Sequence, residues 1–111
     1  MKNLLLLTSF VLLTTSVFAA EETWTNVPIV DVACSAKAKA DPDAHTRSCA
    51  LQCQNSGFGL ITADGEFLKL DDVGNKKAIT AIKEGKNDDH LRFTVSGTRD
   101  GNTVKVSSLS P

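Results

Sequence analysis

The chain has 111 residues, with 12 lysines and arginines against 13 aspartates and glutamates, so its formal net charge is −1. Such a chain offers no broad cationic surface to a phosphate backbone, and five Phe, one Trp and no Tyr leave few rings for base stacking. These counts argue against nucleic-acid binding. The length allows one small domain.

Residues 1–19 predict a secretory signal peptide, because a lysine near the start precedes an apolar stretch that ends in small residues at Ala19. The stretch is shorter than the roughly 20 apolar residues of a transmembrane helix, and no lipoprotein cysteine follows it. We therefore expect an exported product, residues 20–111, that is periplasmic or secreted and keeps no stable membrane anchor after cleavage. Its net charge would be about −2, since the leader carries one lysine and no acid.

The apolar run at residues 27–32 predicts a first strand. Pro28 favours a strand at the edge of a sheet, because proline has no backbone N–H to donate to a neighbouring strand. Residues 34–57 follow as a cysteine-rich helical insert. Its first part allows a helical turn that ends before Pro42.

The second part of the insert predicts a helix that begins at Asp43 or Thr46, where a side-chain oxygen can cap it, and ends at residue 55. Gly57 supplies the left-handed stop. We expect Cys49 and Cys53 on its inward face.

Two hairpins and a helix account for the rest of the chain. Each hairpin is indicated by an Asp-Gly pair between apolar or alternating segments, and an apolar stripe that ends at Gly85 predicts a two-turn helix. The expected segments are strands at 58–62 and 66–70, a helix at 76–83, and strands at 91–96 and 104–109.

This order predicts a mainly β (α+β) fold with two short helices. A strand, a hairpin, a helix and a second hairpin follow one another as in a small five-stranded barrel of the OB type, with the Cys-rich insert after strand 1. A plain sheet with two helices on one face has the same element order. We expect one OB-like domain at residues 20–111.

One pattern of residues runs along the chain, at Ile29-Val30-Asp31, Cys34, His45-Thr46, Cys49, Cys53 and Gly57, and then at residues 95–98 and 101–106. This pattern resembles a family of small exported bacterial proteins of unknown function, and the resemblance covers nearly the whole mature chain. It implies that an OB-like C-terminal half and a Cys…His-x3-Cys-x3-Cys cluster are shared features. It implies no activity.

The cluster is the main candidate site. His45, Cys49 and Cys53 are spaced four residues apart, which on a helix places an imidazole and two thiols along one face, and Cys34 lies near enough to add a third thiol. Four nitrogen and sulfur ligands match a tetrahedral zinc site, and paired thiolates with a histidine also suit cuprous copper. Cys34, His45, Cys49 and Cys53 are therefore candidate metal ligands.

A disulfide from Cys34 to Cys49 or Cys53 is the alternative, because export to an oxidising compartment favours disulfides. It would close a loop of about 15 to 20 residues and contribute roughly 3 kcal/mol. Three cysteines leave one unpaired, which could link two chains in a dimer or, beside His45, act as an activated thiolate.

These observations lead to three hypotheses. The first is an exported, non-enzymatic binding or structural module, stabilised by a disulfide, with an unidentified ligand or protein partner. The second is a cell-envelope protein that binds zinc or copper, and the third is a thiol-redox protein. We expect no enzyme, because the sequence has neither a nucleophile elbow nor a phosphate-binding glycine loop. His90 and the paired aspartates are interpreted as turn residues.

Overall fold

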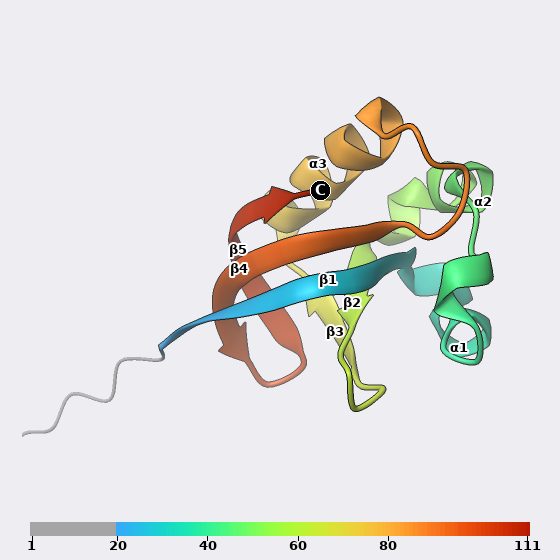
Figure 1. Ribbon diagram of the computed structural model, residues 1–111. Coiled ribbons are helices and arrows are strands. Elements are labelled where there is room, and N and C mark those ends of the chain that lie inside the picture. The colour runs from blue at the N-terminus through green and yellow to red at the C-terminus, as the bar shows by residue number, and fades with distance from the viewer. Residues whose placement is uncertain (1–19) are drawn as a thin grey trace, which may run out of the picture.

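The computed structural model describes residues 20–111, and the predicted signal peptide lies outside them. Five strands close into a barrel in the order β1-β2-β3-β5-β4, and the fold is a small, mainly β, OB-like domain as predicted (Figure 1). The strands are β1 (Glu21–Asp31), β2 (Phe58–Ile61), β3 (Phe67–Leu70), β4 (Arg92–Asp100) and β5 (Thr103–Ser110). The helices are α1 (Ser35–Ala38), α2 (Arg47–Gln52) and α3 (Asp72–Glu84), with short 3-10 turns at Val32–Cys34, Pro42–Ala44 and Gln54–Ser56.

Strand β1 is longer than predicted and lies inside the barrel wall instead of at an edge. Its first part pairs with β4, and its last three residues also pair with β2. Pro28 is tolerated there because its register partner is Arg92 of β4, whereas the ladder to β2 begins only at Ile29. The prediction of an edge strand was therefore wrong.

The two predicted hairpins are confirmed. β2 and β3 pair antiparallel around Gly65, and β4 and β5 pair antiparallel around Gly101, and both glycines have positive φ angles of 84° and 60°. Parallel pairing of β3 with β5 then helps to close the barrel. Local turn chemistry thus specifies both hairpins.

Helix α3 is longer than the predicted two-turn helix because it begins at an aspartate cap. The Asp71 carboxylate accepts a hydrogen bond from the Gly74 N–H at 2.9 Å and another from the Val106 N–H of β5 at 3.2 Å. One side chain therefore starts the helix and attaches it to the barrel. The apolar face of α3 joins a core built mainly from the inner faces of the strands, which includes Ile29, Phe58, Leu60, Leu68, Val95 and Val104, all with no exposed surface.

The cysteine-rich insert packs at one end of the barrel, where α1 and α2 follow β1 (Figure 1). The insert is attached to the chain before β4. Arg92 donates to both carboxylate oxygens of Asp43, at 2.8 and 3.0 Å, and Arg47 donates to the Asn87 carbonyl at 2.6 and 3.1 Å. These contacts hold the insert against the barrel.

The Asp43–Arg92 pair makes stability depend on pH. The hydrogen bonds from Arg92, with its charge, hold the pKa of the Asp43 carboxyl below its ordinary value. A lowered folded-state pKa stabilises the protein above the unfolded-state value, about 3.9, and this contribution is lost as pH falls through the folded-state pKa. We expect Asp43→Asn to reduce the free energy of unfolding by about 1 kcal/mol at pH 7, because the pair is one-third exposed.

Urea unfolding at several pH values checks this expectation. The difference between Asp43→Asn and the wild type should shrink as pH falls below about 4, where the wild-type carboxyl begins to protonate. Asp64→Asn, at an exposed turn position, is the matched control and should change stability little. A deficit in Asp43→Asn that is equally large at pH 7 and pH 2.5 would show that charge is not its cause.

Candidate functional site

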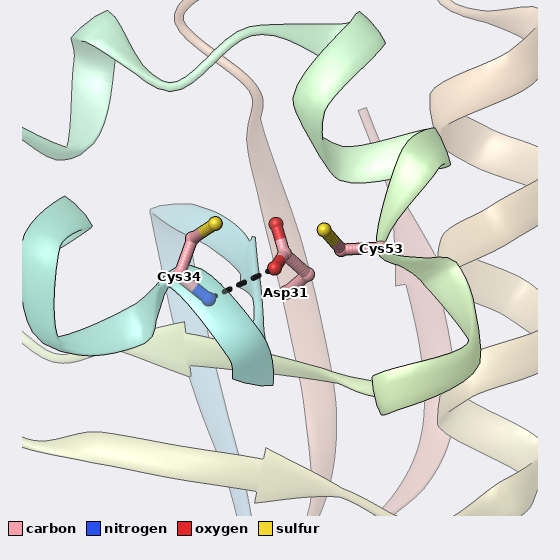
Figure 2. A group of neighbouring side chains, drawn as sticks. All are labelled: Asp31, Cys34 and Cys53. Atoms are coloured by element: carbon pink, nitrogen blue, oxygen red, sulfur yellow. Dashed lines mark hydrogen bonds between the residues drawn. The ribbon is translucent and has the colours of Figure 1, made fainter.

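The site is centred on Asp31, the last residue of β1, whose side chain has no exposed surface. Its Oδ2 accepts a hydrogen bond from the backbone N–H of Cys34 at 3.0 Å and so caps the turn that follows the strand (Figure 2). Asp31 ends a run of five buried positions, 27–31, at the inner end of the strand. A strand end thus places a charged group at the base of the insert.

Two thiols lie beside this carboxylate. One ligand atom each from Asp31, Cys34 and Cys53 lies within 4.8 Å of the other two. Figure 2 shows both sulfurs directed toward the carboxylate, that of Cys34 from the turn before α1 and that of Cys53 from the end of α2. Both cysteines are partly buried free thiols.

Backbone contacts hold the two cysteine-bearing segments together. The Ala33 N–H donates to the Ser56 hydroxyl at 3.1 Å, and that hydroxyl donates to the Cys53 carbonyl at 2.8 Å. The Val32 N–H donates to the Gly57 carbonyl at 2.9 Å. The hydrogen bonds of Ser56 and Gly57, which lie just before β2, therefore hold the segment that carries Cys34 next to the segment that carries Cys53.

His45 lies against the other oxygen of the same carboxylate. Its Nε2 is 2.7 Å from Asp31 Oδ1, and its side chain is 7% exposed. Although this is an ion-pair distance, the two atoms are not aligned as a hydrogen bond, and both lack any hydrogen-bond partner among residues 20–111. Two buried polar atoms therefore face a common region without satisfying each other.

The charge of Asp31 has no lysine or arginine partner in the part of the chain that the structure describes. It raises the pKa of the neighbouring Cys34 thiol, and partial burial and the nearness of Cys53 add to this rise. The raised pKa favours the protonated thiol form of Cys34. A buried carboxylate is costly unless it is paired with a cation or fully hydrogen-bonded.

The structure places the four predicted metal ligands unequally. Cys34 and Cys53 come together, whereas His45 contacts Asp31 and is not part of the three-residue group. Cys49 is exposed and lines a small cavity of about 260 Å³ together with Cys34 and His45. Two disulfide pairings were predicted for Cys34, with Cys49 or with Cys53. The group of Asp31, Cys34 and Cys53 brings together the sulfurs of the Cys34–Cys53 pairing.

The predicted helix over the cluster was too long. The predicted start at Thr46 is confirmed, since Thr46 caps α2 by accepting from the Cys49 N–H at 3.1 Å, and the helix begins at Arg47, after His45. The helix ends at Gln52, before the predicted residue 55. His45 is extended, and Cys53 lies just past the last helical residue. The expected stripe along one helix face is therefore absent, and Cys49 points outward because the short helix buries Ala50 instead.

Asp31 was missed as a site residue, although the sequence carries a signal for it. Asp31 interrupts the apolar run at residues 27–32 and stands three residues before Cys34, which is the spacing of a side-chain cap. His90, interpreted as a turn residue, is indeed exposed, and its imidazole contacts Asp89 at 2.9 Å.

No protein-family model matches the chain, and neither a curated protein nor a solved structure matches it. The resemblance to small exported bacterial proteins stays a prediction. Within residues 20–111, no helix is long and apolar enough to cross a membrane.

Proposed function

We propose that this domain is an exported metal-binding module that binds one zinc ion through Cys34, Cys53 and Asp31, with His45 as the fourth ligand. The observation that carries the proposal is the buried pair of unsatisfied atoms, Asp31 Oδ1 and His45 Nε2, beside two converging thiols. Export to the periplasm or the cell exterior remains part of the proposal, as the N-terminal sequence indicates.

Charge balance supports a cation at this position. The Asp31 carboxylate opposes ionisation of Cys34, and within residues 20–111 no lysine or arginine pairs with this carboxylate. A divalent ion would reverse this effect, because it stabilises both the carboxylate and the thiolates that bind it. Metal binding would then release protons from the thiols.

The donor set favours zinc over cuprous copper. Copper(I) prefers soft sulfur ligands, whereas zinc accepts sulfur, imidazole nitrogen and carboxylate oxygen together. In a tetrahedral zinc site, ligand atoms lie roughly 3.3 to 3.8 Å apart, as follows from metal–ligand bonds of about 2.0 to 2.3 Å. One ligand atom each of Asp31, Cys34 and Cys53 already lies within 4.8 Å of the other two, so side-chain adjustment alone would have to bring them to this spacing.

Four protein ligands would leave no position open for a substrate, so the site would be structural or metal-carrying and not catalytic. This agrees with the expectation of a non-enzymatic protein.

A disulfide between Cys34 and Cys53 is the second candidate, supported by the same closeness of the two sulfurs. It would attach the start of the insert to its end and contribute about 3 kcal/mol by the loop-closure account. Because it would consume two zinc ligands, one chain cannot hold the disulfide and the metal at once. Cys49 stays a thiol in both cases.

Zinc titration of the reduced, chelator-treated protein tests the proposal. We expect one zinc ion per chain by native mass spectrometry, and competition with a chromophoric chelator should show binding weakened at least 100-fold in Cys34→Ser and Cys53→Ser. Asp31→Asn should also weaken binding, because a neutral amide replaces the carboxylate that would bind the ion. Cys49→Ser is the matched control, since it removes a thiol outside the group and should bind zinc like the wild type.

Two results would overturn the zinc proposal. One is reduced protein that takes up no zinc, and the other is affinity that Cys34→Ser leaves unchanged. A different result would instead establish the Cys34–Cys53 disulfide. Protein purified from an oxidising compartment would then contain no metal and have a mass two hydrogens below that of the reduced chain. The Cys49→Ser variant would show the same loss of two hydrogens.

A further inference from the structure

A second, larger cavity shares no residue with the candidate metal site. Its volume is about 730 Å³, and it lies between α3, the segment leading into β4, and the end of β5. Figure 1 shows α3 running beside the C-terminal end of β5, with the chain returning from the helix toward β4. Cavities of this volume commonly hold small molecules.

The floor of this cavity is apolar. Ile82, Leu91 and Phe93 line it at 1%, 6% and 6% exposure, so they belong to the barrel core and form a fixed surface. Ala81 and Leu109 are partly exposed and extend the apolar surface toward solvent. An apolar body of a ligand could pack against these side chains.

The rim of the cavity is cationic although the chain as a whole has a net charge of −1. Lys76, Lys77 and Lys86 are exposed at this rim, and Glu84 is the one acidic side chain among its lining residues. None of the three lysines forms an ion pair within residues 20–111. Their charges are therefore available to an anion.

Contacts with the insert hold one wall of the cavity in place. Asn87 accepts two hydrogen bonds from Arg47, and the His90 N–H donates to the Asp43 carbonyl at 3.0 Å. His90 has a φ of 51°, a left-handed conformation that these contacts maintain. A wall held in this way needs little ordering when a ligand binds.

We propose that this cavity binds a small amphipathic carboxylate, with its apolar body on the floor formed by Ile82, Leu91, Phe93 and Leu109 and its carboxylate at the lysine rim. The apolar floor and the unpaired lysines each select one half of such a molecule. This binding is independent of the proposed zinc site.

Titration with decanoate, below its micelle concentration, tests the proposal by calorimetry and by NMR of backbone amides. We expect one site with a dissociation constant on the order of 10 to 100 µM, and chemical-shift changes confined to α3, residues 85–93 and the end of β5. Acetate has the same charge without the apolar body, and decyltrimethylammonium has the same tail with the opposite charge. Both should bind at least tenfold more weakly.

Charge-reversal variants test whether the carboxylate of decanoate binds at the lysine rim. Lys77→Glu with Lys86→Glu should weaken decanoate binding at least tenfold, whereas Lys69→Glu with Lys105→Glu makes the same charge change outside the cavity and should have little effect. Circular dichroism would confirm that both variants fold. The proposal is wrong if decyltrimethylammonium binds as tightly as decanoate, if the two double variants behave alike, or if the shifts fall outside the cavity.

Discussion

Replacement of His45 by alanine is expected to lower the free energy of unfolding of the metal-free protein by about 2 to 4 kcal/mol, through lost packing of a buried ring and loss of its contact with Asp31. The imidazole is the one basic group next to Asp31 in the described part of the chain, and its Nε2 lies 2.7 Å from the carboxylate oxygen. Without it, the carboxylate, which has no exposed surface, would lose its nearest polar neighbour, and the removed ring would leave a cavity beside it.

A double variant separates charge from packing in this result. If the uncompensated carboxylate causes the loss, Asp31→Asn combined with His45→Ala should be more stable than His45→Ala alone, because a neutral amide of the same shape replaces the charge. Denaturant unfolding in the presence of a chelator measures both variants. If the double variant and His45→Ala are equally stable, the loss of stability comes from the cavity that the imidazole ring leaves.

His90→Asn is the matched histidine control. The His90 side chain is 64% exposed, and asparagine tolerates the left-handed backbone at this position. We expect it to change the free energy of unfolding little. A loss as large as that of His45→Ala would contradict the special role of the buried imidazole.

Replacement of Gly97 by alanine is expected to cost about 3 kcal/mol, at the upper end of the usual cost of overpacking. A Cβ atom at this position would overlap the carbonyl oxygen of Lys105 and lie 3.0 Å from the side chain of Val104, both on β5. The β4–β5 register shifts between Ser96 and Gly97, so the two backbones approach closely there. Relief of the overlap requires the barrel wall to move, because the nearest atoms are backbone.

Thermal and denaturant unfolding of Gly97→Ala measure this cost. Thr98→Ala, the next residue on the same strand, is the control for strand propensity, because Thr98 is partly exposed and not part of the core. It should lose less than about 1 kcal/mol. If the two variants lose the same amount, the close approach at Gly97 is not what requires glycine.

The fold followed from sequence largely because its signals are local. The Asp-Gly turns around Gly65 and Gly101 specify hairpins between neighbouring segments, and the alternation from Leu91 to Ser96 matches the observed burial of β4. Of the two predicted starts of α2, the one capped by Thr46 is confirmed, but α2 ends earlier and α3 begins earlier than predicted. The start of α3 depends on the cap Asp71, whose hydrogen bond competes with other turn conformations of similar energy.

The candidate site was only partly foreseen. Sequence spacing drew attention to His45 and the three cysteines, and the structure brings Cys34 and Cys53 together. The assumption of one continuous helix placed Cys49 inward, whereas the short α2 turns it to solvent. The lysine-rimmed cavity combines residues from α3, β4 and β5, so no single stretch of sequence indicates it.

By itself, the sequence determined the element order, both hairpins and the list of chemically capable side chains, because each depends on residues close together along the chain. Only the tertiary structure decided that Asp31 is a buried charge facing His45 between two thiols. The reason is physical. The state of a carboxylate depends on what surrounds it in space, and here a barrel strand, a 3-10 turn and the end of α2 form those surroundings.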